Sequence, residues 1–244
     1  MTIIKSALAE NLKECSRNEK YSYHMPGHKH GRGAPPLGIE LLGSQVYSAD
    51  LSEMGGFDYL HAPSSYLKDA QAQAARFFGS DQTYFLINGS TAGNIAAILA
   101  VAGEKDYILV SRQSHRSVFS GLELSGAIPI YLKPIYHPIL KGYFSTDSYF
   151  NQFQLPTDAN VKAVHVTRPN YYGLCHDLQP FASISNKLNI PLIVDEAHGA
   201  HFILNRDHLP KSALADGAHI SIQSLHKTLG SLTQSSQLHL KGDL

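Results

Sequence analysis

The chain has 244 residues, of which 43% are hydrophobic, and its 20 basic and 20 acidic side chains leave no net charge at neutral pH. This balance argues against a strong electrostatic attraction to nucleic acid or to a membrane surface, and no apolar run is long enough to span a bilayer. Two cysteines, Cys15 and Cys175, provide no disulfide framework, and the N-terminal residues lack a signal peptide's apolar centre, so we expect a cytoplasmic protein.

The first quarter of the chain is predicted to hold helices separated by two loops. Apolar positions about one turn apart predict an amphipathic helix over residues 3–17. Residues 23–33 are too rich in glycine and proline for a regular element. A second loop, residues 50–63, leads into a helix predicted at 65–78 and ended by Gly79.

Strands and helices then alternate. Strands are predicted at 84–87, 107–110, 128–132, 161–166, 190–194 and 219–222, helices at 91–102, 115–124 and 178–188, and irregular structure at 134–160. The strands are short and almost continuously apolar, which is typical of an α/β fold whose mostly parallel sheet has helices on both faces. In such sheets ligands bind outside the carboxyl ends of the strands.

Residues 88–93, Asn-Gly-Ser-Thr-Ala-Gly, join a predicted strand end to a helix start. The first N–H groups of a helix have no partner within it, and the helix dipole favours an anion there. Ser90 and Thr91 add hydroxyl donors, and the glycines let a phosphate approach the backbone. An ordinary Ser/Thr N-cap is the alternative. Because no Gly-Lys-Ser/Thr follows, the segment is not a Walker A loop.

A carboxylate, Asp195, ends the predicted strand 190–194 and begins the run Asp-Glu-Ala-His-Gly-Ala-His. At a strand end, it could bond the protonated pyridine nitrogen of pyridoxal 5'-phosphate (PLP) and make the cofactor a better electron sink. A helicase box is one alternative, but it would need a phosphate-loop lysine. A metal site is another, with ligands drawn from His198, His201, His24, His28 and His30. Surface histidines in a polar loop are the third.

Lys227 follows the last predicted strand, within Ser224-Leu225-His226-Lys227. A lysine near a strand end is usually a solvated charge. Here it follows a phosphate candidate and a strand-end carboxylate, in an order that suits a Schiff base between the lysine and PLP. His115, between a predicted strand and helix, could stack on a flat cofactor, or could be a surface histidine at a helix start.

Together these segments resemble the Orn/Lys/Arg decarboxylase family of PLP enzymes, in its major-domain half. The resemblance extends from about residue 3 to the end of the chain and rests on stretches in the family's order: residues 24–29 (His-Met-Pro-Gly-His-Lys), 50–54, 85–93, 193–202, 224–229, 232–235 and 238–242.

The resemblance implies a role for each matching residue. Lys227 would form the Schiff base with PLP, and Asp195 would bond the ring nitrogen. The phosphate would be held by Ser90, Thr91, Ala92 and Ser224. His115 would stack on the ring, and His198 and His226 would lie near the ring and the reacting group. No metal ligand is implied.

The resemblance also implies a fold and a reaction. The fold would be the large domain of fold type I (aspartate aminotransferase type), a seven-stranded mostly parallel sheet at residues 63–244, with residues 1–62 supplying interface and substrate loops. The reaction would be decarboxylation of arginine, lysine or ornithine in polyamine synthesis or acid resistance, by a homodimer or larger homo-oligomer. The family's further domain would be absent, so we expect a shortened enzyme. The alternatives are an inactive remnant that partners a full-length relative and, far behind, a metal-dependent hydrolase.

Overall fold

The computed structural model describes residues 7–18, 21–53, 57–139, 141–145, 155, 159–204 and 207–242. It divides into two compact units, Met1–Ala74 and Ala75–Leu244, and the boundary between them falls within the residues of helix α4 (Tyr66–Phe78). Over the described ranges, every helix is too short or too polar to cross a membrane.

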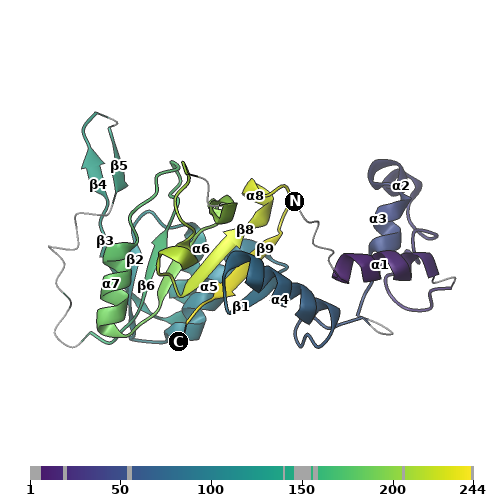
Figure 1. The fold of residues 1–244 in the computed structure, drawn as a ribbon, viewed down its shortest axis with the longest axis horizontal. Coiled ribbons are helices and arrows are strands. Elements are labelled where there is room, and N and C mark those ends of the chain that lie inside the picture. The colour runs from purple at the N-terminus through teal and green to yellow at the C-terminus, as the bar shows by residue number, and fades with distance from the viewer. Residues whose placement is uncertain are drawn as a thin grey trace. The chain divides into compact units, whose positions relative to one another are not determined.

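The first unit is helical (Figure 1). The predicted N-terminal helix is α1 (Ala7–Asn18), and the part of the prediction before residue 7 lies outside the described residues. Two short helices, α2 (Pro36–Leu42) and α3 (Ser44–Ala49), were not predicted. The carboxylate of Asp58 accepts hydrogen bonds from backbone N–H groups at the start of α4, at 2.7–3.3 Å, so it fixes the loop before this helix.

The second unit is built on a seven-stranded sheet with the order β1-β9-β8-β7-β6-β2-β3. The strands are β1 (Gln82–Leu86), β2 (Tyr107–Ser111), β3 (Ile128–Leu132), β6 (Val161–Thr167), β7 (Leu192–Asp195), β8 (Ile220–Ser224) and β9 (Ser236–Leu240). The five strands from β8 to β3 are parallel, and β9 runs antiparallel to both of its neighbours. The predicted α/β fold with a mostly parallel sheet is therefore confirmed.

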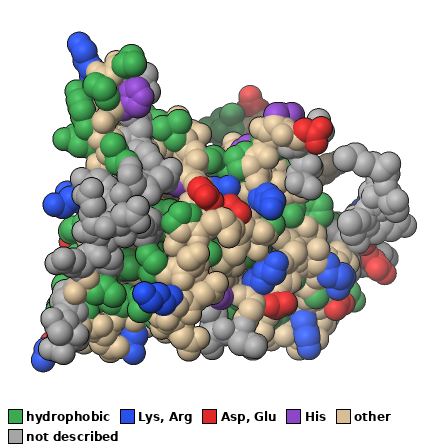
Figure 2. Space-filling model, turned by 60° about the vertical axis from the view of Figure 1, so that its left-hand side comes forward, with side chains coloured by type: hydrophobic (Ala, Val, Ile, Leu, Met, Phe, Trp, Pro, Cys, Tyr) green, Lys and Arg blue, Asp and Glu red, His purple; other side chains and the backbone are tan. Residues whose placement is uncertain are grey.

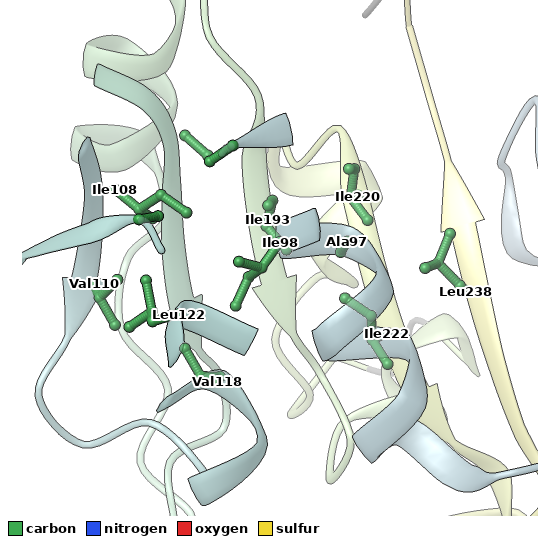
Figure 3. Packing of buried hydrophobic residues seen from close by; sticks show 13 residues of the cluster. Ala97, Ile98, Ile108, Val110, Val118, Leu122, Ile193, Ile220, Ile222 and Leu238 are labelled. Carbon is green, nitrogen blue, oxygen red and sulfur yellow. The ribbon is translucent and has the colours of Figure 1, made fainter. Parts of the chain in front are cut away.

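Helices cover both faces of this sheet (Figure 1). One apolar core joins α5 (Gly89–Val101) and α6 (Arg116–Ser125) to the sheet, through side chains such as Ile98, Val118 and Ile222 (Figure 3). The other core joins the opposite face to α7 (Gln179–Leu188) through Phe181. Continuously apolar strands follow from this arrangement, because side chains on both faces are buried.

Gly93 allows α5 to lie close to the sheet. A Cβ atom at this position would come within 2.6 Å of Leu86 Cδ1 and 2.9 Å of Ile222 Cγ2. These distances are too short for real carbon contacts, so a side chain here would push the helix away from the strands. The close packing also fixes where the N-terminus of α5 lies relative to the strand ends.

Residues 134–160 were predicted to be irregular, and this is wrong for two short strands. β4 (Ile135–His137) and β5 (Gly142–Ser145) form an antiparallel hairpin that carries the exposed side chains of Tyr136 and Tyr143. The hairpin rises beyond the sheet in Figure 1, and Figure 2 shows hydrophobic side chains gathered on it. Much of the remaining range lies outside the described residues.

β9 was also missed, because its sequence, Ser-Gln-Leu-His-Leu, is too polar to predict a buried strand. Its polar side chains are buried all the same. His239 bonds Thr83 of β1 through Nδ1 at 2.8 Å and Gln223 of β8 through Nε2 at 3.2 Å. His239 can therefore lie inside this sheet because both of its ring nitrogens find partners on the neighbouring strands.

Candidate active site

A cavity of about 980 Å³ opens at the carboxyl ends of the central strands. Thr167, Asp195 and Ser224 are the last residues of β6, β7 and β8, and all three line it. This is the edge at which parallel sheets bind ligands. The cavity is also lined by residues at the N-termini of α5 and α6 and by residues of α8 (Leu225–Thr228).

Most of the predicted site residues line this one cavity. They are Ser90, Thr91, His115, Asp195, His198, Ser224, His226 and Lys227. Ala92, predicted beside Ser90 and Thr91, is not among the described residues that line it. Asp195 is the one carboxylate in the described lining, which also carries the cations Arg116 and Lys227, so the cavity suits anionic ligands.

One end of the cavity offers hydroxyl and N–H donors. Ser90 Oγ lies 2.7 Å from Ser224 Oγ and 3.1 Å from Ser236 Oγ, and all three serines are buried. Helix α5 begins one residue earlier, at Gly89, and its N-cap residue Asn88 makes no side-chain capping bond. Ser90 and Thr91 therefore lie in the first turn and are not its N-cap, and the helix N-terminus faces the cavity with its dipole.

Sequence reasoning missed Ser236, because β9 was not predicted. It pairs directly with Ser224 across the β8–β9 ladder. A strand prediction there would have paired these two serines.

Lys227 and His198 contact each other in the lining of the cavity. Lys227 Nζ lies 3.0 Å from His198 Nε2. Burial lowers the pKa of Lys227, against an opposing contribution from the Asp195 charge. Burial also lowers the pKa of His198, and the positive charge of Lys227 adds to this effect. Both shifts favour neutral nitrogen atoms, and a neutral amine is a nucleophile.

His226, the neighbour of Lys227, is oriented by the backbone. Its Nδ1 lies 3.0 Å from the carbonyl oxygen of Ser235. A carbonyl oxygen only accepts, so Nδ1 carries a proton and donates it to this bond. The other ring nitrogen, Nε2, is then the atom of His226 available to a ligand in the cavity.

Asp195 is held by a network that sequence reasoning did not find. Asn94 Nδ2 donates to Asp195 Oδ2 at 3.0 Å and to Ser117 Oγ at 3.1 Å, and its Oδ1 lies 3.3 Å from His165 Nε2. Asn94 follows Ser90 by four residues on α5, so it lies on the same helix face. That spacing is the signal that could have found it.

Two of the candidate metal ligands share a cavity. His198 and His201 both line a second, smaller cavity of about 540 Å³, and Nε2 of His198 lies 3.0 Å from Lys227 Nζ. In the part of the chain that the structure describes, no three His, Cys, Asp or Glu side chains are grouped so that they could hold a metal ion. The metal alternative therefore has no support from geometry.

Comparisons with known proteins agree on one family. The family model described as Orn/Lys/Arg decarboxylase, major domain, matches residues 6–244. The chain is 39% identical over 241 residues to the uncharacterized protein YaaO of Bacillus subtilis, covering 97% of this chain and 49% of that protein. It is 36% identical over 244 residues to an arginine decarboxylase of Bacillus cereus, covering 100% of this chain and 53% of that protein.

Solved structures show the same likeness. A lysine decarboxylase of Francisella novicida aligns with 99% of this chain at a TM-score of 0.78 and 25% identity, and the alignment covers 36% of that chain. The chain spans about half the length of the curated relatives named above.

Proposed function

We propose that this protein, which belongs to the Orn/Lys/Arg decarboxylase family, binds PLP in the cavity and removes the carboxylate of a basic amino acid. One observation carries the proposal. An amine whose pKa is lowered by burial, a strand-end carboxylate and a hydroxyl-rich helix N-terminus all face the same cavity. These are Lys227, Asp195 and the Ser90 end of α5.

The donor set fits the three parts of the cofactor. The phosphate suits the N-terminus of α5 with Ser90, Thr91 and Ser224, where hydroxyls and helix N–H groups meet a dianion. The ring nitrogen suits Asp195, a buried carboxylate. Its hydrogen bonds in the described chain come from Asn94 and the backbone N–H of Ala197, and not from an arginine or lysine. The aldehyde suits the amine of Lys227.

When bound, PLP supplies an electron sink for the bond that breaks at Cα. The residues of this chain do the rest. His198 Nε2, 3.0 Å from Lys227 Nζ, would hold or pass the proton of that amine. His226 turns Nε2 towards the cavity, where it can deliver a proton to the product. His115, which also lines the cavity, would stack on the cofactor ring.

The relatives extend this proposal to substrate and setting. Arginine and lysine decarboxylases are among them, which supports a basic amino acid as substrate, and we propose that the product feeds polyamine synthesis. We further propose a cytoplasmic homodimer or larger homo-oligomer, to which residues 1–62 contribute contact and substrate loops.

Titration of the purified chain with PLP tests the proposal. A visible absorption band of lysine-bound cofactor should appear with the natural sequence and be lost in Lys227→Ala. Lys187→Ala, at the exposed end of α7, is the matched control and should keep the band. An unchanged band in Lys227→Ala would reject the lysine assignment.

A second measurement separates catalysis from the alternative role as a partner of a full-length relative. Release of carbon dioxide from arginine, lysine or ornithine by the purified chain would exclude a purely non-catalytic role. A chain that shows the absorption band but releases no carbon dioxide would retain the cofactor site and would point to that role.

A further inference from the structure

Asn94 connects the two groups that would face the cofactor ring. Its amide Nδ2 has two hydrogen atoms, one directed to Asp195 Oδ2 at 3.0 Å and the other to Ser117 Oγ at 3.1 Å. Ser117 Oγ in turn lies 2.8 Å from His115 Nδ1. Asn94, Ser117 and Asp195 are each at most 2% exposed, so the connection runs through the protein interior.

The partners of Asn94 fix which way its amide points. With Nδ2 donating twice, Oδ1 must accept, and the atom facing it at 3.3 Å is His165 Nε2. His165 therefore carries its proton on Nε2. Burial lowers the pKa of His165 to about 4, although the Asp195 charge opposes the shift, so the ring is neutral near pH 7. A neutral ring with a proton on Nε2 leaves Nδ1 bare, and Nδ1 has no hydrogen-bond partner in the described chain.

The contacts of His115 likewise determine which of its ring nitrogens carries the proton. The backbone N–H of Ser117 donates to His115 Nδ1 at 3.2 Å, which makes this ring the N-cap of α6. Because Nδ1 accepts that bond, it carries no proton, and Ser117 Oγ can also donate to it. The hydroxyl of Ser117 then has only its acceptor side left for Asn94. The three hydrogen bonds therefore all point the same way: His165 donates to Asn94, Asn94 donates to Ser117, and Ser117 donates to His115.

We propose that Asn94 is a positioning residue that sets the donor and acceptor roles of both Asp195 and His115 towards the cofactor. It occupies Oδ2 of Asp195, while the backbone N–H of Ala197 occupies Oδ1 at 3.1 Å, so the carboxylate is held at both oxygens. It also keeps Ser117 donating to His115, so that ring presents its Nε2–H edge to the cavity. The role of Asn94 towards the cofactor rests on the proposed function, whereas the proton positions on His115 and His165 can be measured without any cofactor.

The first test uses the protein without cofactor. Two-bond proton–nitrogen spectra of histidine-labelled protein report which ring nitrogen carries the proton. The natural sequence should show Nε2–H for both His115 and His165. In Asn94→Asp, which keeps the shape but replaces two donors with acceptors, the His115 signal should change and His165 should keep Nε2–H, because it keeps its acceptor.

The second test is PLP affinity, measured by the absorption band. Asn94→Asp should raise the dissociation constant for PLP at least about tenfold, because Asp195 loses the donor that holds its Oδ2 in place for the ring nitrogen. Ser117→Ala cuts the connection to His115 alone, so its affinity loss should be smaller. This graded order is not expected if Asn94 merely fills space.

Thr83→Val is the matched control, because it removes a buried bond to another buried histidine, His239, on the same sheet but away from the cavity. It should leave the signals of His115 and His165 and the affinity for PLP unchanged. Natural-sequence affinity and an unaltered His115 signal in Asn94→Asp would overturn the inference. If the natural sequence itself binds no PLP, the proposed function fails, and the histidine spectra still decide the roles assigned to Asn94.

Discussion

Lys227 Nζ and His198 Nε2 lie 3.0 Å apart in the lining of one cavity, and partial burial lowers the pKa of both groups. Each shift moves the protonation equilibrium of its nitrogen towards the neutral form, and a single proton can be shared between the two nitrogens. The pair brings together residues 29 positions apart in the sequence, from the ends of two adjacent parallel strands. Its chemistry should therefore depend on pH in a defined direction.

Capture of PLP by Lys227 should rise with pH and level off below 10.5, the ordinary pKa of a lysine amine. The sign follows from burial, which disfavours the ammonium form, so the reactive amine is present at lower pH than in a free lysine. Stopped-flow absorbance over a pH series measures the midpoint. N-acetyl-lysine methylamide under the same conditions is the reference, and a coinciding midpoint would contradict the assignment.

His198→Gln should slow cofactor capture without abolishing it. A positioned proton acceptor contributes about 10²–10⁴-fold in typical cases, and the loss here should lie at the lower end because solvent can replace part of the role. The rate constant of band formation measures this. His137→Gln, on the hairpin β4–β5, is the control and should keep the natural rate.

Removal of the Ser90 hydroxyl should weaken PLP binding about tenfold, in line with one lost bond to a charged group. Ser236→Ala should have a smaller effect, because Ser236 contacts Ser90 at 3.1 Å and is not among the described residues that line the cavity. Equilibrium titrations give both dissociation constants. Pyridoxal, which lacks the phosphate, should bind all three proteins equally, and a parallel loss for pyridoxal would place these serines elsewhere on the cofactor.

Much of this fold was predictable because the central strands are short and mostly apolar. β2, β3, β6 and β8 were placed within two residues of their bounds. The position of Asp195 at the end of β7 and that of Lys227 shortly after β8 followed directly. α5 was expected to begin at Thr91 and begins at Gly89, because the positive φ of +71° at Gly89 allows the chain to turn into the helix earlier.

The buried polar residues could not be predicted in the same way. Asn94, His165 and His239 are buried because each has partners on other elements, and those partners lie 16–156 positions away in the sequence. A sequence pattern shows an unusual polar residue in an apolar stretch, but not what satisfies it. β9 was missed for the same reason, because its polar side chains become buried only when the strand pairs with β8 and β1.

Glu196 should make stability fall as pH rises. Burial raises its pKa from 4.5 to about 7, against hydrogen bonds from Gln223 and the backbone of Ala213 that favour the ionised form. A carboxyl with a raised folded-state pKa contributes stability that is fully present below pH 4.5 and lost as pH rises through about 7.

Comparison with Glu196→Gln isolates this contribution. From pH 4.5 to above 7, the unfolding free energy of the natural sequence should fall relative to the variant by up to about 3 kcal/mol. Urea unfolding at several pH values measures the difference. Glu123→Gln, on the exposed face of α6, should follow the natural profile, and a constant difference for Glu196→Gln would show that the buried carboxyl does not titrate in this range.

Gly93→Ala should both destabilise the fold and weaken the phosphate end of the cavity. The added Cβ would meet Leu86 at 2.6 Å and Ile222 at 2.9 Å, and overpacking of this kind costs about 1–3 kcal/mol, more than the roughly 0.5–1 kcal/mol that alanine gains over glycine in a helix. Relief of the clash moves α5 away from the sheet and so separates Ser90 from Ser224, now 2.7 Å apart. Urea unfolding and PLP titration measure the two effects. Ala96→Gly, on the exposed side of the same helix, changes helix propensity alone and should lower stability without loss of PLP affinity. Full affinity in a destabilised Gly93→Ala variant would separate the helix packing from the site.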